Sequence, residues 1–155
     1  MIELTREEID ALLREQVVGR VGCHVDGFTY VVPLIYAYDG EAVYVASIEG
    51  QKVEMMRANP SVCFEVDEYG PEGWRSAIVH GVYEELGEGE VPTALALLRE
   101  RFAENGNGNR RSPETHSRST VCFRIDIRTV TGRAVRRLSP PVVRRSASRR
   151  RRRTT

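Results

Sequence analysis

The residues that could do chemistry gather in the stretch VASIEGQKVEMMRANP, residues 45–60, which contains the single lysine of a chain with 22 arginines. Ser47 and Gly50 precede Lys52, which falls in the first turn of a short predicted helix. The free N–H groups and the dipole at a helix N-terminus favour an anion, so these groups together could bind a phosphate. The spacing S-x-x-G-x-K is not that of a P-loop, and an ordinary capped helix with a solvated lysine is the alternative interpretation.

A proline inside an apolar run is the second unusual feature. Pro33 lies in VVPLIY, where it removes a backbone donor from a strand, and such prolines are confined to edges, bulges or places where something else approaches. A flat ligand lying against Val32, Pro33 and Leu34 would use this break. An edge strand with a bulge explains the same residues without a ligand.

Local patterns predict the elements that must position these residues. Thr5 and Glu8 form a capping box ahead of apolar residues at helical spacing, which predicts a helix over 5–16. Three β-like runs follow, joined by Asp-Gly dipeptides of the kind that tight hairpins prefer. These runs, which predict an antiparallel meander, are residues 17–25, 28–38 and 41–47, with turns at Asp26-Gly27 and Asp39-Gly40.

The rest of the chain continues with strands and short helices. The helix after Gly50 should end at Asn59, because Pro60 cannot continue it. Strands are predicted over 61–69, 74–86 with an interruption at Gly81, and 121–130 with Val121, Phe123, Ile125 and Ile127 facing inward. A third helix opens at Pro92 with Leu95, Leu98 and Phe102 on one face, and a polar loop covers 104–119. Six strands with marginal helices predict a mainly β fold, a closed six-stranded antiparallel barrel.

The charge of the chain is divided between two unlike parts. Residues 136–155 hold nine arginines and no acidic residue, so positions 1–135 keep 14 basic against 22 acidic side chains. The sequence therefore predicts a folded domain over 1–135 and a disordered Arg-rich tail over 136–155. The tail could bind nucleic acid or anionic lipid through counterion release, or could be a solvated extension.

Cysteine and histidine usage points away from metal and disulfide chemistry. Cys23, Cys63 and Cys122 lie in apolar strand-like runs without ligand spacing, so they are predicted to be reduced core residues and no metal site is expected. His24 and His80 are interpreted as ordinary strand residues. The acidic N-terminus and the absence of an 18-residue apolar stretch predict a cytoplasmic protein without a membrane partner.

Four segments together resemble a known family. GRVGCHVDGFTYVVPLIYAYDGEAVYV, SIEGQKVEMMRANPSVCFEV, WRSAIVHGVYEEL and VCFRIDIRTVTGR are similar to the FMN-binding split-barrel proteins related to pyridoxamine 5′-phosphate oxidase. Within them the chain resembles the branch that includes nitroimidazole-resistance proteins, over roughly residues 5–135. The resemblance implies a six-stranded antiparallel split β-barrel that forms a homodimer with two FMN sites at the subunit interface.

The resemblance also implies roles for individual residues. The FMN phosphate would be held by Ser47, Gln51 and Lys52, and the isoalloxazine ring would lie along main-chain groups of Val32, Pro33 and Leu34. Trp74, Arg75 and Ser76 fall on a strand that borders the cofactor in relatives, in the same or in the partner subunit. Ala46 stands where the nitroimidazole-resistance branch has a histidine, and the C-terminal signature of pyridoxamine phosphate oxidases is missing, so vitamin B6 synthesis is not predicted.

Two function classes remain from the sequence. The first is an FMN-dependent oxidoreductase that passes electrons from a reduced nicotinamide or deazaflavin to a small acceptor such as a quinone or nitroaromatic. The second is a non-catalytic flavin-binding or flavin-sensing module whose basic tail docks to nucleic acid. No catalytic residue is assigned, because the flavin itself carries hydride chemistry.

Overall fold

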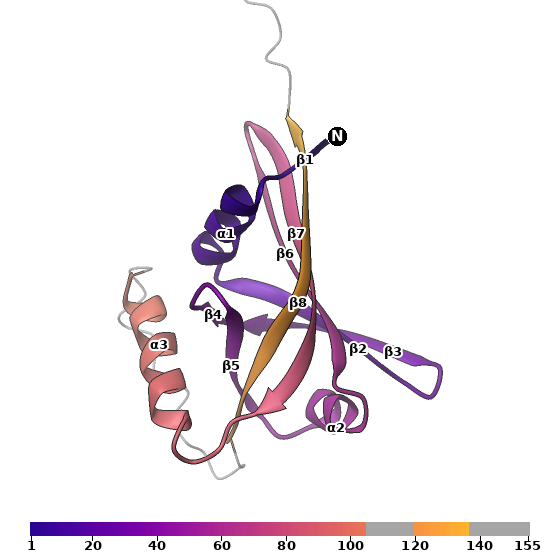
Figure 1. Ribbon diagram of the computed structural model, residues 1–155, viewed down its shortest axis with the longest axis vertical. Coiled ribbons are helices and arrows are strands. Elements are labelled where there is room, and N and C mark those ends of the chain that lie inside the picture. Colours follow the sequence, from indigo (N-terminus) through magenta and orange to yellow (C-terminus); the bar gives the residue numbers. More distant parts are fainter. Residues whose placement is uncertain (105–119, 137–155) are drawn as a thin grey trace, which may run out of the picture.

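The computed structural model describes residues 1–104 and 120–136. The predicted polar loop and the predicted Arg-rich tail therefore lie outside the described residues, apart from one residue of each. The elements in chain order are β1 (Ile2–Glu3), α1 (Arg6–Glu15), β2 (Val18–Val25), β3 (Phe28–Ile35), β4 (Ala37–Tyr38), β5 (Ala42–Ile48), α2 (Gln51–Ala58), β6 (Ser61–Gly70), β7 (Gly73–Glu85), α3 (Val91–Glu104) and β8 (Thr120–Arg136). Figure 1 shows the long strands β6, β7 and β8 running the length of the molecule, with α1 and α3 on one side.

All strands belong to one antiparallel sheet that curls back on itself. Its order is β3-β2-β6-β7-β8-β5-β4, with β1 paired to β8. The two ends of this order, β3 and β4, are separated in the chain only by Tyr36, whose N–H donates to the carbonyl of Val17 at 3.2 Å. The chain itself thus joins the two edges of the sheet. The mainly β split-barrel prediction is confirmed, with six long strands and the two-residue strands β1 and β4 in addition.

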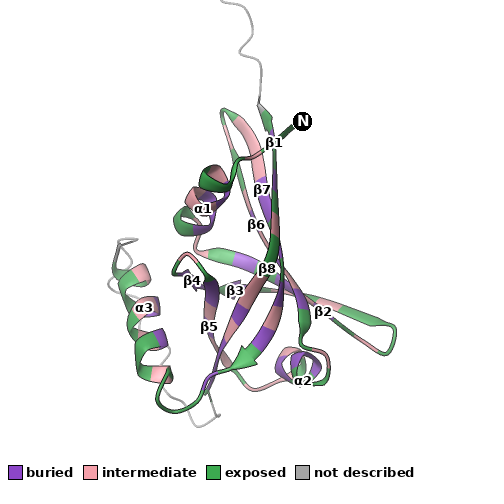
Figure 2. Ribbon diagram, in the orientation of Figure 1, coloured by how far each residue is buried: buried purple, intermediate pink, exposed green. Residues whose placement is uncertain are grey.

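The core fills the inside of this curled sheet. Phe64 and Tyr36 are fully buried and pack edge to face, with ring centroids 5.0 Å apart. The inward residues of β8 alternate as predicted, because Val121, Phe123 and Ile125 are buried and Ile127 packs partly against the core. Figure 2 shows the buried positions along the strands and on the inner side of α1 and α2.

Helix α1 begins where the capping box predicts. The Thr5 hydroxyl accepts from the N–H of Glu8 at 3.3 Å, and the Glu8 carboxylate accepts from the N–H of Thr5 at 2.8 Å. Ile9, Leu12 and Leu13 bury the inner face of the helix. The box therefore fixes the start of a helix that covers one end of the barrel.

Removing the cap should measurably destabilise the protein. Thr5→Ala takes away the acceptor for one N–H of the first turn, and we expect the free energy of unfolding to fall by about 1 kcal/mol in urea titration. Thr131→Ala, at an exposed position of β8, is the control and should stay within about 0.5 kcal/mol of wild type. Equal effects of the two substitutions would show that the cap contributes nothing.

The predicted meander keeps both of its turns, because Asp39 and Gly40 lie between the paired strands β4 and β5, but its middle strand is divided. The turn at Asp26 and Gly27, both with positive φ, joins β2 and β3 as predicted. The run predicted as one strand over 28–38 is divided at Tyr36, so that β3 pairs with β2 and the short β4 pairs with β5. Strand β5 takes β8 as its other neighbour. A hairpin turn is determined by the residues next to it, whereas the second neighbour of β5 is β8, a strand more than 70 residues further along the chain.

The interruption predicted at Gly81 is a bulge in the pairing of β7 with β8, where the register shifts between His80 and Gly81. A Cβ atom at Gly81 would lie 2.5 Å from the carbonyl oxygen of Asp126, so only glycine allows this close approach.

Helix α3 buries Leu98 as predicted, whereas Phe102 is 36% exposed. Among the described residues, none of the helices has the length and apolarity needed to cross a membrane.

Candidate phosphate and flavin site

The turn from β5 into α2 carries the predicted phosphate-binding residues. Ser47 is half-buried near the end of β5 and donates its hydroxyl hydrogen to the carbonyl of Ile48 at 3.2 Å. Gln51 and Lys52 are the first two residues of α2. The structure therefore brings these three residues to one turn of the chain.

The N-terminus of α2 is open, unlike that of α1. Gly50 is the N-cap and supplies no side-chain hydrogen bond to the first turn. Its φ of 167° is extended backbone that any residue could adopt, and a Cβ atom there would meet nothing within 4 Å. N–H groups at an uncapped helix start need an outside acceptor.

Lys52 is free to meet that acceptor. The side chain is half-buried, and it forms no ion pair with any residue in the ranges 1–104 and 120–136. By contrast, Arg57 in the last turn of the same helix is held by two carboxylates. An open helix start beside an unpaired ammonium is chemically suited to a phosphate group, and the residues present fit the phosphate of a flavin nucleotide.

The ring-binding residues predicted on β3 are connected to this turn through β2. Helix α2 packs against β2, and β2 pairs with β3 along its whole length. Leu34 is buried in the core, Val32 is half-buried, and Pro33 is exposed opposite Arg20. Strand β3 ends the order of the sheet and its register continues regularly through Pro33, so the edge position expected for this proline is present without a bulge.

Trp74, Arg75 and Ser76 lie toward the opposite end of the long strands from the phosphate turn. Strand β8 pairs with Ser47 at Val121 and with Trp74 at Val135. These two positions are 14 residues apart, which corresponds to roughly 45 Å along a strand that rises about 3.3 Å per residue. A single chain therefore does not bring residues 74–76 to the phosphate residues.

Arg75 already has two carboxylate partners in the chain. Its guanidinium donates to Glu68 at 2.6 Å and to Glu15 of α1. These bonds tie α1 to the β6–β7 hairpin, a structural role that the sequence interpretation missed because Glu15 and Arg75 are 60 residues apart. Trp74 is half-buried and Ser76 is 8% exposed.

The cysteines and histidines form no reactive cluster in the described part of the chain. Cys23 and Cys122 are buried as predicted, whereas Cys63 is only half-buried. Burial raises the pKa of all three thiols, so they stay protonated at neutral pH. His24 is exposed and its Nδ1 lies 2.8 Å from the Thr29 hydroxyl. Among the described residues no group of three or more His, Cys, Asp and Glu side chains could hold a metal ion.

Comparison with known proteins decides the family. The family model described as pyridoxamine 5′-phosphate oxidase matches residues 5–134, which include all three groups of predicted site residues. The chain belongs to this family. The resemblance predicted from the four sequence segments is thereby confirmed.

Solved structures of other proteins share the fold. A FAD-binding protein from Mesorhizobium loti is 36% identical, with a TM-score of 0.72 over 86% of this chain and 97% of that one. A FAD-binding protein from Mycobacterium smegmatis is 23% identical, with a TM-score of 0.66 over 88% and 99%. A candidate 5-nitroimidazole antibiotic resistance protein from Bacteroides thetaiotaomicron is 21% identical, with a TM-score of 0.67 over 86% of each chain.

The chain also matches a curated protein of the same size class over part of its length. An uncharacterized protein of Rhizobium meliloti (strain 1021) is 36% identical over 84 residues. The match covers 54% of this chain and 56% of that protein. The chain thus aligns with little more than half of this curated relative.

Proposed function

We propose that the protein binds a flavin nucleotide, FMN, with its phosphate at the turn from β5 into α2. The observation that carries the proposal is the open N-terminus of α2 next to Lys52, which has no ion-pair partner among the residues that the structure describes. Ser47 and Gln51 would add a hydroxyl and an amide to the same phosphate. A bound flavin would supply hydride or single-electron chemistry, while the chain supplies binding and orientation.

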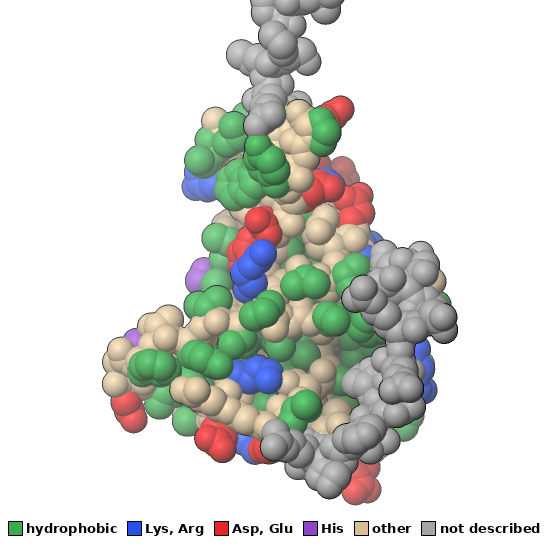
Figure 3. Space-filling view, turned by 180° about the vertical axis from the view of Figure 1, so that it is seen from behind, with side chains coloured by type: hydrophobic (Ala, Val, Ile, Leu, Met, Phe, Trp, Pro, Cys, Tyr) green, Lys and Arg blue, Asp and Glu red, His purple; other side chains and the backbone are tan. Residues whose placement is uncertain are grey.

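We further propose that the site is completed by a second copy of the chain. Residues 74–76 lie at the far end of β8 from the phosphate turn, so they could border the flavin only from another subunit. The outer face of the sheet carries apolar side chains suited to such contact. They include Val18, Val31, Ile35 and Ile78, which are 47%, 60%, 45% and 38% exposed. Figure 3 shows hydrophobic side chains spread over the back of the molecule between fewer charged ones.

A groove runs across this outer face. It has a volume of about 740 Å³ and is lined from β2, β3, β6 and β7 by residues that include Gly22, Val31, Cys63, Ile78 and His80. In a homodimer the partner subunit would cover this groove, whose lining combines apolar side chains with the charged residues Arg20, Glu65 and Arg128.

FAD is the alternative nucleotide, because the 36% identical structure from Mesorhizobium loti is described as FAD-binding. FMN ends in a phosphate monoester with two negative charges, which suits a lysine at a helix start. Release of the cofactor by heat denaturation, followed by chromatography against FMN and FAD standards, decides between them.

The enzymatic function we propose is electron transfer from a reduced nicotinamide or deazaflavin to a small acceptor. The purified protein should show flavin absorption in the visible range or acquire it on addition of FMN. The bound flavin should bleach anaerobically with excess NADH or NADPH and recolour with a quinone, at turnover rates of roughly one per second or faster. A colourless protein that ignores added FMN would contradict both the enzymatic and the binding proposal.

A flavin-binding module without turnover is the second candidate, and the nine arginines of residues 136–155 favour it. Clustered arginines bind nucleic acid through the release of counterions. This candidate is supported if dithionite reduces the bound flavin while NADH, NADPH and a reduced deazaflavin do not.

A further inference from the structure

Arg57 joins three segments around the turn that we propose for the phosphate. It lies in the last turn of α2, and its guanidinium faces two carboxylates. One edge donates to Glu85 at the end of β7, from Nε at 2.8 Å and from Nη2 at 2.7 Å. The other edge donates to both oxygens of Glu49, through Nη1 and through Nη2 at 3.3 Å. The planar fork of arginine is thus used on both sides, which lysine could not reproduce.

Glu85, the far anchor of this arrangement, is connected to the core. Glu85 also accepts from the hydroxyl of Tyr83 at 3.2 Å, and the ring of Tyr83 packs on Phe123 with centroids 5.0 Å apart. Hydrogen bonds from Arg57 hold the pKa of Glu85 below its ordinary value, so this carboxylate is ionised at neutral pH. The guanidinium is therefore held to the barrel itself.

Glu49, the near anchor, is part of the phosphate turn. Glu49 lies between Ser47 and Gly50, in the loop that connects β5 to the open start of α2. A free carboxylate at this place would repel a phosphate, and an unanchored loop would not keep the hydroxyl and the helix start facing the same point.

We propose that Arg57 is a positioning residue for phosphate binding: it fastens Glu49 to the end of β7 and so keeps both the loop and this negative charge away from the bound phosphate. The inference rests on the proposed flavin binding. It assigns a function to an ion-pair cluster of a kind that, at a protein surface, usually contributes little to stability.

The test compares the dissociation constants of FMN and riboflavin, which differ only in the phosphate. Arg57→Gln should weaken FMN binding by roughly tenfold, the lower end of what loss of a supporting residue costs at metal sites. Riboflavin binding should change little. Arg57→Lys, which keeps the charge without the two-edged fork, should restore only part of the loss. Thermal unfolding is recorded for every variant.

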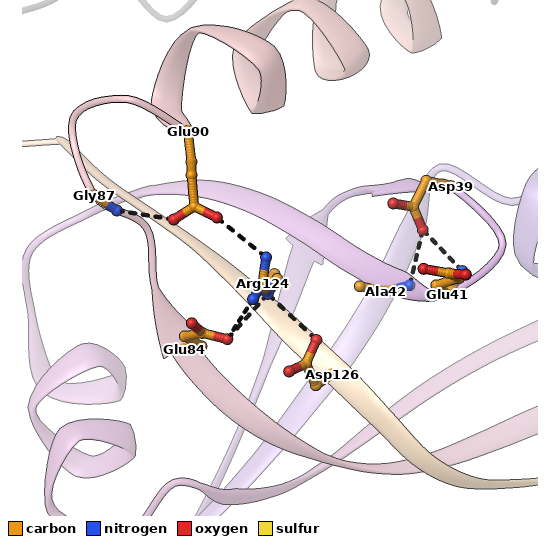
Figure 4. A network of polar contacts seen from close by, with 8 residues as sticks. All are labelled: Asp39, Glu41, Ala42, Glu84, Gly87, Glu90, Arg124 and Asp126. Atoms are coloured by element: carbon orange, nitrogen blue, oxygen red, sulfur yellow. Dashed lines mark hydrogen bonds and ion pairs between the residues drawn. The ribbon is translucent and has the colours of Figure 1, made fainter.

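Arg124 offers a matched control on the other side of β7. Its guanidinium donates to Glu84 at 2.7 and 3.0 Å and to Glu90 at 3.2 Å, and it lies 3.3 Å from Asp126 (Figure 4). Glu84 and Glu85 are neighbours on β7 that serve the two arginines separately. Arg124→Gln removes a comparable set of ion pairs without touching the phosphate turn, and it should leave the ratio of FMN to riboflavin affinity unchanged.

Two outcomes would count against the inference. A ratio of FMN to riboflavin affinity that is unchanged in Arg57→Gln, whether or not both affinities fall, would overturn it while leaving the proposed flavin binding intact. A shift of the ratio in Arg124→Gln as large as in Arg57→Gln would show a general loss of structure. If Arg57→Gln does not fold, Glu85→Gln removes the far anchor alone and should shift the ratio in the same direction. A wild-type protein that binds neither flavin overturns the proposed function.

Discussion

Replacing Lys52 with alanine should weaken FMN binding by about 1–3 kcal/mol, the range of a charge-assisted hydrogen bond. The ammonium lies beside an uncapped helix start and forms no ion pair within the described residues, so the substitution removes a charge and breaks no ion pair there. Isothermal titration of apoprotein with FMN and with riboflavin measures the effect. Riboflavin, which has no phosphate, should bind with nearly unchanged affinity.

Two further variants sharpen this experiment. Lys52→Arg keeps the positive charge in a larger planar group and should recover part of the FMN affinity. Glu54→Gln removes an exposed acid from the same helix turn, and because a nearby carboxylate repels the phosphate it should strengthen FMN binding slightly. Equal losses for FMN and riboflavin in Lys52→Ala would show that Lys52 is not at the phosphate.

Replacing Phe64 with alanine should lower the free energy of unfolding by about 3–5 kcal/mol, the usual range for a fully buried phenylalanine. Its ring fills space that Gly19 leaves open, because a Cβ atom at Gly19 would lie only 2.1 Å from the ring. The cavity would thus open between β2, β6 and Tyr36, where the chain joins the two edges of the sheet. Guanidinium titration monitored by circular dichroism measures the loss.

Phe28 is the matched control for this substitution. It is 54% exposed near the tip of the β2–β3 hairpin, so Phe28→Ala removes the same side chain without opening a cavity. We expect a change of less than about 1 kcal/mol. A loss as small as this in Phe64→Ala would mean that the barrel does not depend on packing at its closure.

The sequence by itself determined the local elements and the family. The capping box at Thr5, the Asp26-Gly27 turn and the stop at Pro60 act through neighbouring residues, so each appears in the structure where it was predicted. The resemblance to the pyridoxamine 5′-phosphate oxidase family was likewise visible in short segments, because residues at a turn into a helix keep their spacing whatever the rest of the chain does.

Only the tertiary structure decided how distant residues meet. Strand pairing depends on partners far along the chain, so the separation of β3 from β5 and the distance from Ser47 to Trp74 along β8 could not be predicted from local patterns. The same holds for Arg57, whose partner Glu85 is 28 residues away and gives no signal in the sequence. The ion-pair partners of a long charged side chain are the groups that the fold brings within its reach, and the packing of the whole barrel determines which groups these are.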